Sequence, residues 1–206
     1  ESLNFNEAAS LPCAGLTAWS GIINLGEIKS GQIVLTQGSG GVSLFSLQFS
    51  KMVGAKIIAT SSSEKKLEKL KDMGADYTIN YIKNPKWGEE VLDYTSGLGV
   101  DHIMDVGGGD TLKQSLRAIK PGGTISLVGV LDNARSNILI PLIGSRNIRL
   151  QGVTVGSIEE LKKMNNAIEA NNIKPVIDKT FEFLNFKNAY LHLQSGKHFG
   201  KVCISL

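Results

Sequence analysis

The sequence predicts an α/β fold built on a doubly wound parallel sheet, and three observations carry this prediction. Apolar segments of strand length alternate with segments of helical periodicity between residues 32 and 155. The strand segments are apolar on both faces, which is typical of a parallel sheet covered by helices on both sides. Glycine clusters follow several of these segments, where parallel topology brings the loops to one edge of the sheet.

The composition is that of an ordinary globular protein, with 42% hydrophobic and 20% charged residues in a chain of 206. The formal net charge of +3 is too small, and the lysines are too dispersed, to favour nucleic acid as a partner. No apolar run reaches membrane-spanning length, so we expect no membrane partner. Two cysteines at opposite ends of the chain, Cys13 and Cys203, favour free thiols in a reducing compartment, and the expected location is cytoplasmic.

The N-terminal segment combines small and apolar residues with helical spacing over 6–25, and we expect Pro12 and Gly15 to break this helix. The chain begins without methionine and reaches a helix start almost at once. It therefore resembles the middle of a protein, and we expect a piece of a longer chain whose upstream half is missing from this sequence.

The first strand–helix–strand unit is predicted for residues 32–60. A β-branched and aliphatic run at 32–37 stops at a cluster of glycines, helical periodicity follows at 41–53, and a second apolar run comes at 56–60. A Lys-Pro-Gly-Gly sequence at 120–123 is expected to stop a later helix. The further helices are predicted at 64–73, 87–95 and 111–119, and the further strands at 77–80, 101–106, 124–130 and 147–155.

The alternation ends after residue 155. The sequence then predicts an amphipathic helix at 158–170, a short extended segment at 175–178, a helix at 184–193 and a closing strand at 200–206. Because these pieces do not continue the alternating pattern, we assign them to a second lobe.

The turn after the first strand is Gly38-Ser39-Gly40-Gly41-Val42-Ser43. It leaves backbone N–H groups free at a helix N-terminus, where a pyrophosphate can bind. It departs from the full dinucleotide fingerprint, because Ser43 stands in place of the third glycine. A plain strand-to-helix turn is the alternative, but the flanking strand and helix favour a nucleotide.

The end of the second strand carries no acidic residue of the kind that holds the ribose hydroxyls of NAD. Three serines stand there at 61–63, followed by Lys65 and Lys66. Hydroxyls and an ammonium suit a 2′-phosphate, so the sequence favours NADPH. Ser61 and Glu64 also have the spacing of a helix capping box, an interpretation that is compatible with the first.

Two further glycine loops are expected at the same edge of the sheet. Gly107-Gly108-Gly109 follows the fourth strand, and Val128-Gly129-Val130 ends the fifth. We expect Val106 and the residues of these loops to line the nicotinamide end, although glycines that merely end strands are the alternative.

The three histidines, His102, His192 and His198, have no metal-ligand spacing with one another or with a cysteine, and we predict that each is structural. Asp101 and Asp105 bracket a strand and are expected to act in turns or caps.

Several segments spread over nearly the whole chain match one family pattern: residues 12–19, 37–43, 59–66, 74–76 with 79–81, 100–109, 120–130 and 198–202. Together they resemble the medium-chain dehydrogenase/reductase superfamily, most closely its zinc-type alcohol dehydrogenase-like and quinone oxidoreductase branches. The resemblance implies a Rossmann domain for the coenzyme at 15–155. Residues 1–14 and 156–206 would then belong to a GroES-like catalytic lobe, most of which precedes the coenzyme domain in this family.

The resemblance also implies roles for single residues. Zinc-dependent alcohol dehydrogenases place one ligand at the position of Cys13, but a catalytic zinc needs three protein ligands, so we expect no metal here and a small buried residue at Cys13. The residues implied in cofactor binding are Ser39, Gly40, Gly41 and Val42 for the pyrophosphate, Ser61, Ser62 and Lys66 for the 2′-phosphate, Tyr81 near the adenine ribose phosphate, Val106, Gly107, Val128, Gly129 and Val130 around the nicotinamide and its ribose, and Gly200 and Lys201 approaching from the C-terminal strand.

Members of the family often dimerise through strands of the coenzyme domain. The apolar residues at 138–140 and 142–143 are candidates for such a contact, or for an ordinary part of the core. We therefore expect a homodimer.

These observations predict the coenzyme-binding part of an NADP(H)-dependent oxidoreductase, which transfers a hydride between the nicotinamide and a small molecule: an alcohol or aldehyde, a quinone or an enone. No general acid or base is evident near the loops, so we expect this chain alone to bind the cofactor with little or no turnover. The alternatives are a non-catalytic NADPH-binding module, a zinc-dependent alcohol dehydrogenase, and a structural α/β domain with a vestigial loop.

Overall fold

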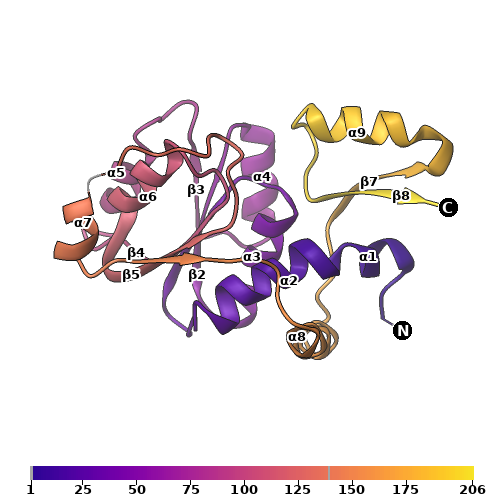
Figure 1. The fold of residues 1–206 in the computed structure, drawn as a ribbon, viewed down its shortest axis with the longest axis horizontal. Helices are drawn as coiled ribbons and strands as arrows, with labels where there is room; N and C mark the ends of the chain where they lie inside the picture. Colours follow the sequence, from indigo (N-terminus) through magenta and orange to yellow (C-terminus); the bar gives the residue numbers. More distant parts are fainter. Residues whose placement is uncertain (1, 139) are drawn as a thin grey trace.

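A computed structural model of the chain describes residues 2–138 and 140–206. Its centre is a six-stranded parallel sheet in the order β3-β2-β1-β4-β5-β6 (Figure 1). The chain adds strands outward on one side of β1 and then returns to add them on the other side, which is the doubly wound arrangement. The predicted α/β fold class is confirmed.

Strands and helices alternate along this part of the chain as predicted, and the last of the helices is an additional one. The strands are β1 (Ile33–Gln37), β2 (Lys56–Ser61), β3 (Tyr77–Asn80), β4 (Val100–Asp105), β5 (Ile119–Leu127) and β6 (Arg149–Gly152). The helices between them are α3 (Gly41–Met52), α4 (Glu64–Asp72), α5 (Trp87–Tyr94), α6 (Thr111–Ala118) and α7 (Ile140–Ser145).

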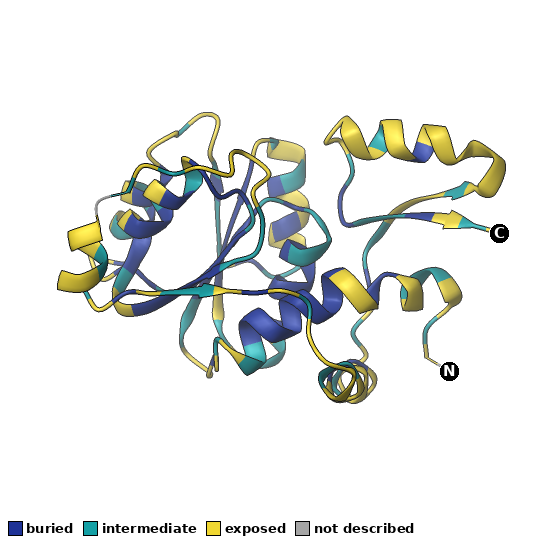
Figure 2. Ribbon diagram, in the orientation of Figure 1, coloured by how far each residue is buried: buried dark blue, intermediate teal, exposed yellow. Residues whose placement is uncertain are grey.

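Strand β1 shows why the strands are apolar on both faces. Val34 packs in one cluster with Phe45 of α3, whereas its neighbour Leu35 packs in another with Val91 of α5 and Leu116 of α6. Successive side chains of a strand point to opposite faces, and here both faces are covered by helices. Figure 2 shows the buried residues concentrated along the sheet and on the inner sides of these helices.

The N-terminal segment forms a helix that the sequence does not predict correctly. It runs through α1 (Phe5–Ala9), the π-helical turn η1 (Leu11–Gly15), α2 (Leu16–Trp19) and a second π-helical turn, η2 (Ser20–Asn24). Pro12 and Gly15 therefore do not end it. Pro12 lies at the start of a π-helical turn, where its missing N–H is tolerated, and Gly15 lies against Leu11 and Met164, which approach the position of a Cβ to 3.3 and 3.5 Å.

Strand β5 begins five residues earlier than predicted. Ile119 already pairs with Val100, and a register shift follows before Thr124 pairs with His102. Gly122 has a φ of 76°, and the bulge takes up the Pro-Gly-Gly residues that are expected to stop the preceding helix. Residues 128–130, predicted as strand, lie beyond its end.

Helix α7 is not predicted, and it contains much of the apolar segment proposed for a dimer contact. Ile138 and Ile143 pack against the core of the sheet, whereas the exposed fractions of Ile140 and Leu142 are 74% and 41%. Leu139, which belongs to the same predicted segment, lies outside the described residues.

The last part of the chain departs from the alternation, as predicted. It contains α8 (Ile158–Ala170), β7 (Ile177–Glu182), the 3-10 turn η3 (Phe183–Asn185), α9 (Phe186–Gln194) and β8 (Lys201–Ser205). Helix α8 packs on α2, and β7 and β8 pair in parallel beneath α9, beside the large sheet (Figure 1). The domain limits at 15–155 stay a prediction. Within the described ranges, no helix is both long and apolar enough to cross a membrane.

Candidate functional site

The turn between β1 and α3 lies at the carboxyl edge of the sheet. Gly38 has a φ of 76°, a conformation that favours glycine, and its N–H donates to the carbonyl of Thr60 at 2.9 Å. Gly40 occupies the N-cap of α3, and no side chain caps this helix. The first N–H groups of a helix have no partner within the helix, so the turn offers them to an anion.

The backbone conformation at Gly40 does not require a glycine. Its φ of −79° and ψ of 178° are extended and open to any residue. A Cβ built there would meet nothing within 4 Å, because the position faces a cavity. The absent side chain therefore leaves space for a group outside the chain, which is what a pyrophosphate cradle requires.

Ser43 replaces the third glycine of the fingerprint without leaving a polar group unpaired. Its hydroxyl is buried in α3 and donates to the carbonyl of Gln37 at 2.5 Å. A small side chain with a local partner is thus accommodated where helix and strand pack closely.

A cavity of about 410 Å3 lies beside this turn, a volume in the range of small-molecule sites. It brings together eleven of the predicted cofactor residues: Ser39, Gly40, Gly41, Val42, Ser61, Ser62, Lys66, Tyr81, Val106, Val128 and Gly129. Gly107 lies instead in an adjoining cavity of about 490 Å3, which shares Tyr81 and Val106 with the first.

The remaining predicted residues lie outside the lining of these cavities. Gly200 pairs with Gly40 through a parallel bridge, and the side chain of Lys201 covers Gly41, so both adjoin the turn. Val130 does not line either cavity, and 62% of its surface is exposed. It lies past the end of β5, where the sequence predicts the strand to continue.

The serines after β2 do not form the capping box that their spacing suggests. Ser63 is the N-cap of α4, but no side chain makes a capping bond there, and the Ser61 hydroxyl accepts from the N–H of Ser63 at 3.4 Å. Glu64 turns instead to Lys83, which lies in the turn after β3, and to Asn80 at the end of β3; both donate to its carboxylate and lower its pKa. The interpretation of Ser61 and Glu64 as a capping box is therefore wrong.

Lys66 supplies a cation to the wall of the same cavity. Its Nζ donates to the carbonyl of Gly196 at 2.7 Å, which ties α4 to the loop before β8. Burial lowers the pKa of this ammonium, and the Asp178 carboxylate partly offsets the effect. The ammonium is thus held by a neutral carbonyl, in the wall of the cavity that Ser61 and Ser62 also line, and a bound anion can replace this contact.

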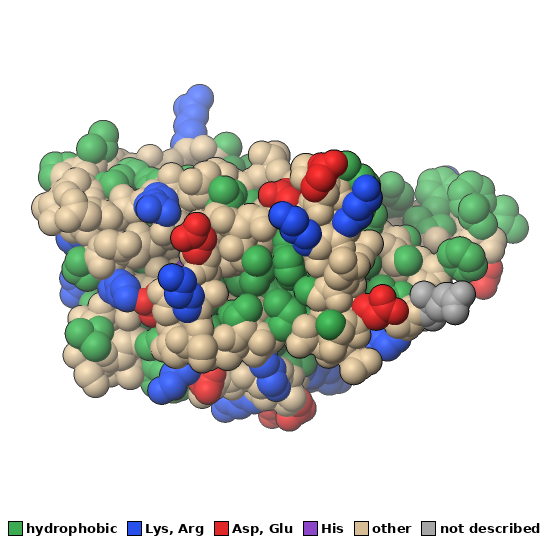
Figure 3. All heavy atoms as spheres, turned by 90° about the horizontal axis from the view of Figure 1, so that it is seen from below, with side chains coloured by type: hydrophobic (Ala, Val, Ile, Leu, Met, Phe, Trp, Pro, Cys, Tyr) green, Lys and Arg blue, Asp and Glu red, His purple; other side chains and the backbone are tan. Residues whose placement is uncertain are grey.

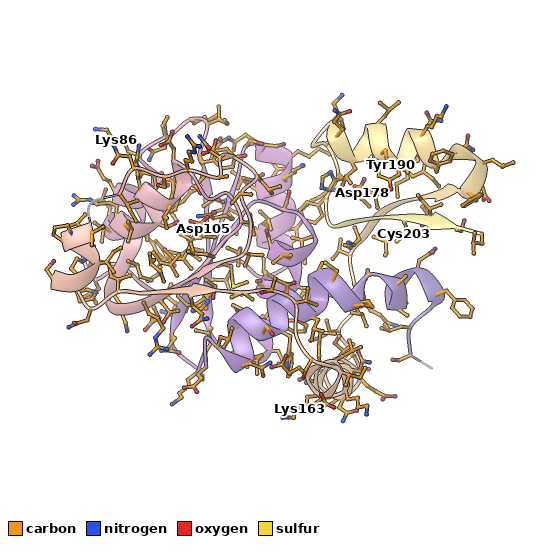
Figure 4. All side chains as sticks on the ribbon, in the orientation of Figure 1. Lys86, Asp105, Lys163, Asp178, Tyr190 and Cys203 are labelled. Carbon is orange, nitrogen blue, oxygen red and sulfur yellow. The ribbon has the colours of Figure 1, made fainter. Side chains whose placement is uncertain are left out.

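A buried polar network fixes the loop after β4. Gln37 donates to Asp105 at 3.2 Å and to Ser115 at 2.8 Å, and its amide oxygen accepts from the N–H of Val106 at 3.2 Å. Asp105, labelled in Figure 4, also accepts from the N–H of Gly108 at 2.9 Å, in agreement with its predicted role in a turn. The carboxyl ends of β1 and β4 are therefore locked together beneath the cavity.

Four cavity-lining residues are missed by sequence reasoning: Gln37, Leu131, Gly196 and His198. A polar residue at the end of a buried strand is a signal that points to Gln37. His198 is predicted to be structural, yet it lies in the cavity wall, because the second lobe folds back onto the glycine turn. No local pattern in the sequence predicts that contact.

The described residues do not by themselves make a zinc site. A catalytic zinc needs three protein ligands, and no cluster of three His, Cys, Asp or Glu side chains able to hold a metal occurs in residues 2–138 and 140–206. Cys13 is exposed on the N-terminal helix, so the prediction that it is buried is wrong.

Residues 41–170 match the zinc-binding dehydrogenase family. The zinc-type alcohol dehydrogenase-like protein C1773.06c of Schizosaccharomyces pombe is 42% identical over 100% of this chain and 61% of its own length. The 2-methylene-furan-3-one reductase of Solanum lycopersicum is 33% identical over 99% of this chain and 48% of its own length. The chain thus spans about 60% of the length of the first of these relatives and about half of the length of the second.

Solved structures show the same arrangement. A Sinorhizobium meliloti protein is 40% identical, with a TM-score of 0.95 over 100% of this chain and 60% of its own. An NAD-dependent alcohol dehydrogenase is 31% identical, with a TM-score of 0.91 over 99% of this chain and 60% of its own. The mycobacterial protein Rv1454c, complexed with NADPH, is 25% identical, with a TM-score of 0.86 over 98% of this chain and 66% of its own.

Proposed function

Because this chain belongs to the zinc-binding dehydrogenase family of the medium-chain dehydrogenase/reductase superfamily, we propose that it forms the NADP(H)-binding part of an oxidoreductase. The observation that carries the proposal is one cavity lined by the glycine turn, Ser61, Ser62 and Lys66. When bound, the cofactor supplies the hydride chemistry. The chain supplies binding and orientation.

Each part of the cofactor has matching groups in the chain. The pyrophosphate binds the free N–H groups at the start of α3, next to the open space at Gly40. The 2′-phosphate binds the hydroxyls of Ser61 and Ser62 and the Lys66 ammonium, and none of the described residues that line this cavity is acidic. The nicotinamide lies toward Val106 and Gly129, at the ends of β4 and β5.

The substrate is a small molecule that exchanges a hydride with the nicotinamide: an alcohol or aldehyde, a quinone or an enone. The names of the relatives support this range, because they include an alcohol dehydrogenase-like protein and a 2-methylene-furan-3-one reductase.

NAD(H) is a second candidate cofactor, because one structural neighbour is an NAD-dependent alcohol dehydrogenase. The two cofactors differ by the 2′-phosphate alone. Lys66 and the serines at the end of β2 therefore decide between them.

The substitution Lys66→Ala tests the assignment of the phosphate. We expect the dissociation constant for NADPH to rise about 10-fold or more, because a charge-assisted bond to the phosphate is lost, while that for NADH stays within about 2-fold. Lys65→Ala is the matched control, since this neighbouring lysine is exposed and does not line the cavity. An equal loss of both cofactors, or no loss, would sink the assignment.

We also propose that the chain forms a homodimer through the outer edge of the sheet. Strand β6 is an edge strand, and the apolar side chain of Ile140 on α7 is exposed close to it in sequence. An exposed strand edge can pair with a second copy.

A further inference from the structure

We propose that His198 contacts the 2′-phosphate of NADPH together with Ser61, Ser62 and Lys66, and that NADPH binding is therefore accompanied by uptake of a proton. The inference rests on the proposed function of the cavity and adds a residue that determines cofactor specificity and a dependence on pH.

The segment that carries His198 is fixed against the sheet domain on both sides of this residue. The carbonyl of Gly196 accepts from Lys66 of α4, and the ring of Phe199 lies 5.1 Å from the Nζ of Lys69, one helical turn further along α4. The N–H of Gly200 donates to the carbonyl of Ser39 at 2.9 Å. The backbone at residue 198 is thereby held between α4 and the glycine turn.

A second set of contacts comes from the lobe itself. Asp178 of β7 accepts from the N–H of Phe199 at 3.1 Å, and its other oxygen lies 2.6 Å from the Nε2 of His192 on α9. Figure 4 shows Asp178 on the side of the lobe that faces the large sheet. Both oxygens of this carboxylate are therefore engaged, and neither is bonded to His198.

The imidazole of His198 has an unused hydrogen-bonding group. This residue lines the cavity that Ser61, Ser62 and Lys66 also line. Its Nδ1 is screened from water and has no hydrogen-bond partner among the residues that the structure describes. A buried polar atom of this kind is costly unless something pairs with it or its ring turns toward a ligand.

The charges around His198 favour an anion in the cavity. The groups that act on it are Lys66 of α4, Lys201 of β8, His192 of α9 and Asp178 of β7. Burial and the Lys66 charge lower the pKa of this imidazole, against the opposing effect of Asp178. A pKa below that of a free imidazole favours the neutral form of His198 in the free chain at pH 7.

A bound 2′-phosphate reverses this balance. A dianion beside the imidazole favours its protonated form, in which both ring nitrogens donate. The proton comes from solvent, and no covalent bond is formed or broken. NADH lacks the phosphate and therefore gives no such uptake at this site.

Calorimetric titration at pH 7, in two buffers of different ionisation enthalpy, measures the number of protons taken up on binding. The chain as it stands is titrated with NADPH, NADH and 2′,5′-ADP, and so are three variants. His198→Gln removes the titrating group, His198→Arg keeps a cation that does not titrate, and Lys197→Gln removes a neighbouring charge that does not line the cavity.

We expect proton uptake with NADPH and 2′,5′-ADP in the unaltered chain and in Lys197→Gln, and less uptake in both His198 variants. His198→Gln also weakens NADPH about 10-fold and leaves NADH within about 2-fold, whereas His198→Arg retains the preference for NADPH. The phosphate exchanges protons on its own account, so the His198→Gln value serves as the baseline.

Equal uptake in the unaltered chain and in both His198 variants would overturn the inference, and so would an unchanged affinity of His198→Gln for NADPH. If Lys66→Ala still removes the preference for NADPH in that case, the proposed function stands without His198. If the unaltered chain does not distinguish NADPH from NADH, both fail. The melting temperature of each variant establishes that it is folded. If His198→Gln does not fold, His198→Arg provides the comparison of proton uptake with the unaltered chain.

Discussion

For single residues of the site, the structure distinguishes a role in ligand binding from a role in folding. Gly40 is the clearest example of a residue for binding. Its backbone is extended, and the space beside it is empty. Ser43 shows the opposite situation, because its hydroxyl is bonded within the fold. The site therefore contains residues whose replacement should change the affinity for the ligand and residues whose replacement should change the stability of the fold.

Gly40→Val should weaken cofactor binding without unfolding the chain. The added side chain projects into the space for the pyrophosphate, so the dissociation constant for NADPH should rise at least about 10-fold. Loss of glycine at an N-cap should cost no more than about 1 kcal/mol of unfolding free energy. Calorimetry and urea denaturation measure the two effects.

Gly144→Val is the control for this substitution, because a Cβ at Gly144 also meets nothing within 4 Å, but far from the cavity on α7. It should leave NADPH binding unchanged. Normal binding by Gly40→Val would show that the pyrophosphate does not use this turn.

His102 should make the fold sensitive to acid. It is fully buried in β4, neither ring nitrogen has a partner among the described residues, and burial lowers its pKa from 6.5 to about 4. Between about pH 6.5 and pH 4, the unfolded chain therefore binds a proton at His102 that the folded chain does not bind. Through His102, the unfolding free energy is therefore highest above about pH 6.5 and falls as the pH drops toward 4.

From pH 7 to pH 5, the unaltered chain should lose about 2 kcal/mol of unfolding free energy through His102. His102→Leu should remove this loss and keep the fold at pH 7, since an apolar side chain leaves no unpaired nitrogen. Urea denaturation of both proteins at the two pH values measures the difference. Equal losses in the two proteins would show that His102 does not carry the effect.

Elements were predictable where one local pattern decided them. Helices α3 and α4 and strands β2 and β3 follow from periodicity and glycine punctuation, and their ends agree with prediction to within about a residue. The start of β5 was not predictable, because pairing with β4 overrides a Pro-Gly-Gly sequence that favours a loop. The N-terminal helix continues through Pro12 by means of a π-helical turn that no local rule indicates.

Helices α5 and α6 depend on Gly88 for their close packing. A Cβ there would lie 2.6 Å from the carbonyl oxygen of Gln114, a backbone atom that cannot turn aside. Gly88→Ala should therefore push the helices apart and lower the unfolding free energy by about 1–3 kcal/mol. Gly144→Ala is the control in urea denaturation, and unchanged stability of Gly88→Ala would contradict this packing.

At the scale of the whole molecule, the cavity is assembled from parts that are distant in sequence. The glycine turn and the serines after β2 were predictable, because each carries its own local pattern. His198 was not, since its position depends on the second lobe, which is tied to the turn through Gly200 and to α4 through Gly196.

Basic and acidic side chains are intermixed on the face shown in Figure 3.

The proposed dimer is tested by Ile140→Asp, which puts a charge on the exposed surface of α7. Sedimentation equilibrium should show a dimer for the unaltered chain and a lower association constant for the variant. Leu98→Asp, at an exposed apolar residue in the loop before β4, should leave the association unchanged. A monomer in the unaltered chain would rule out the dimer.

The most direct measurement is a calorimetric titration of the unaltered chain with NADPH and with NADH. Binding of NADPH at least about 10-fold tighter than NADH, a difference of about 1.4 kcal/mol, is the predicted result. Equal affinity for the two cofactors would contradict the assignment of Lys66 and the serines to a 2′-phosphate. A folded chain that binds neither would contradict the assignment of the cavity itself.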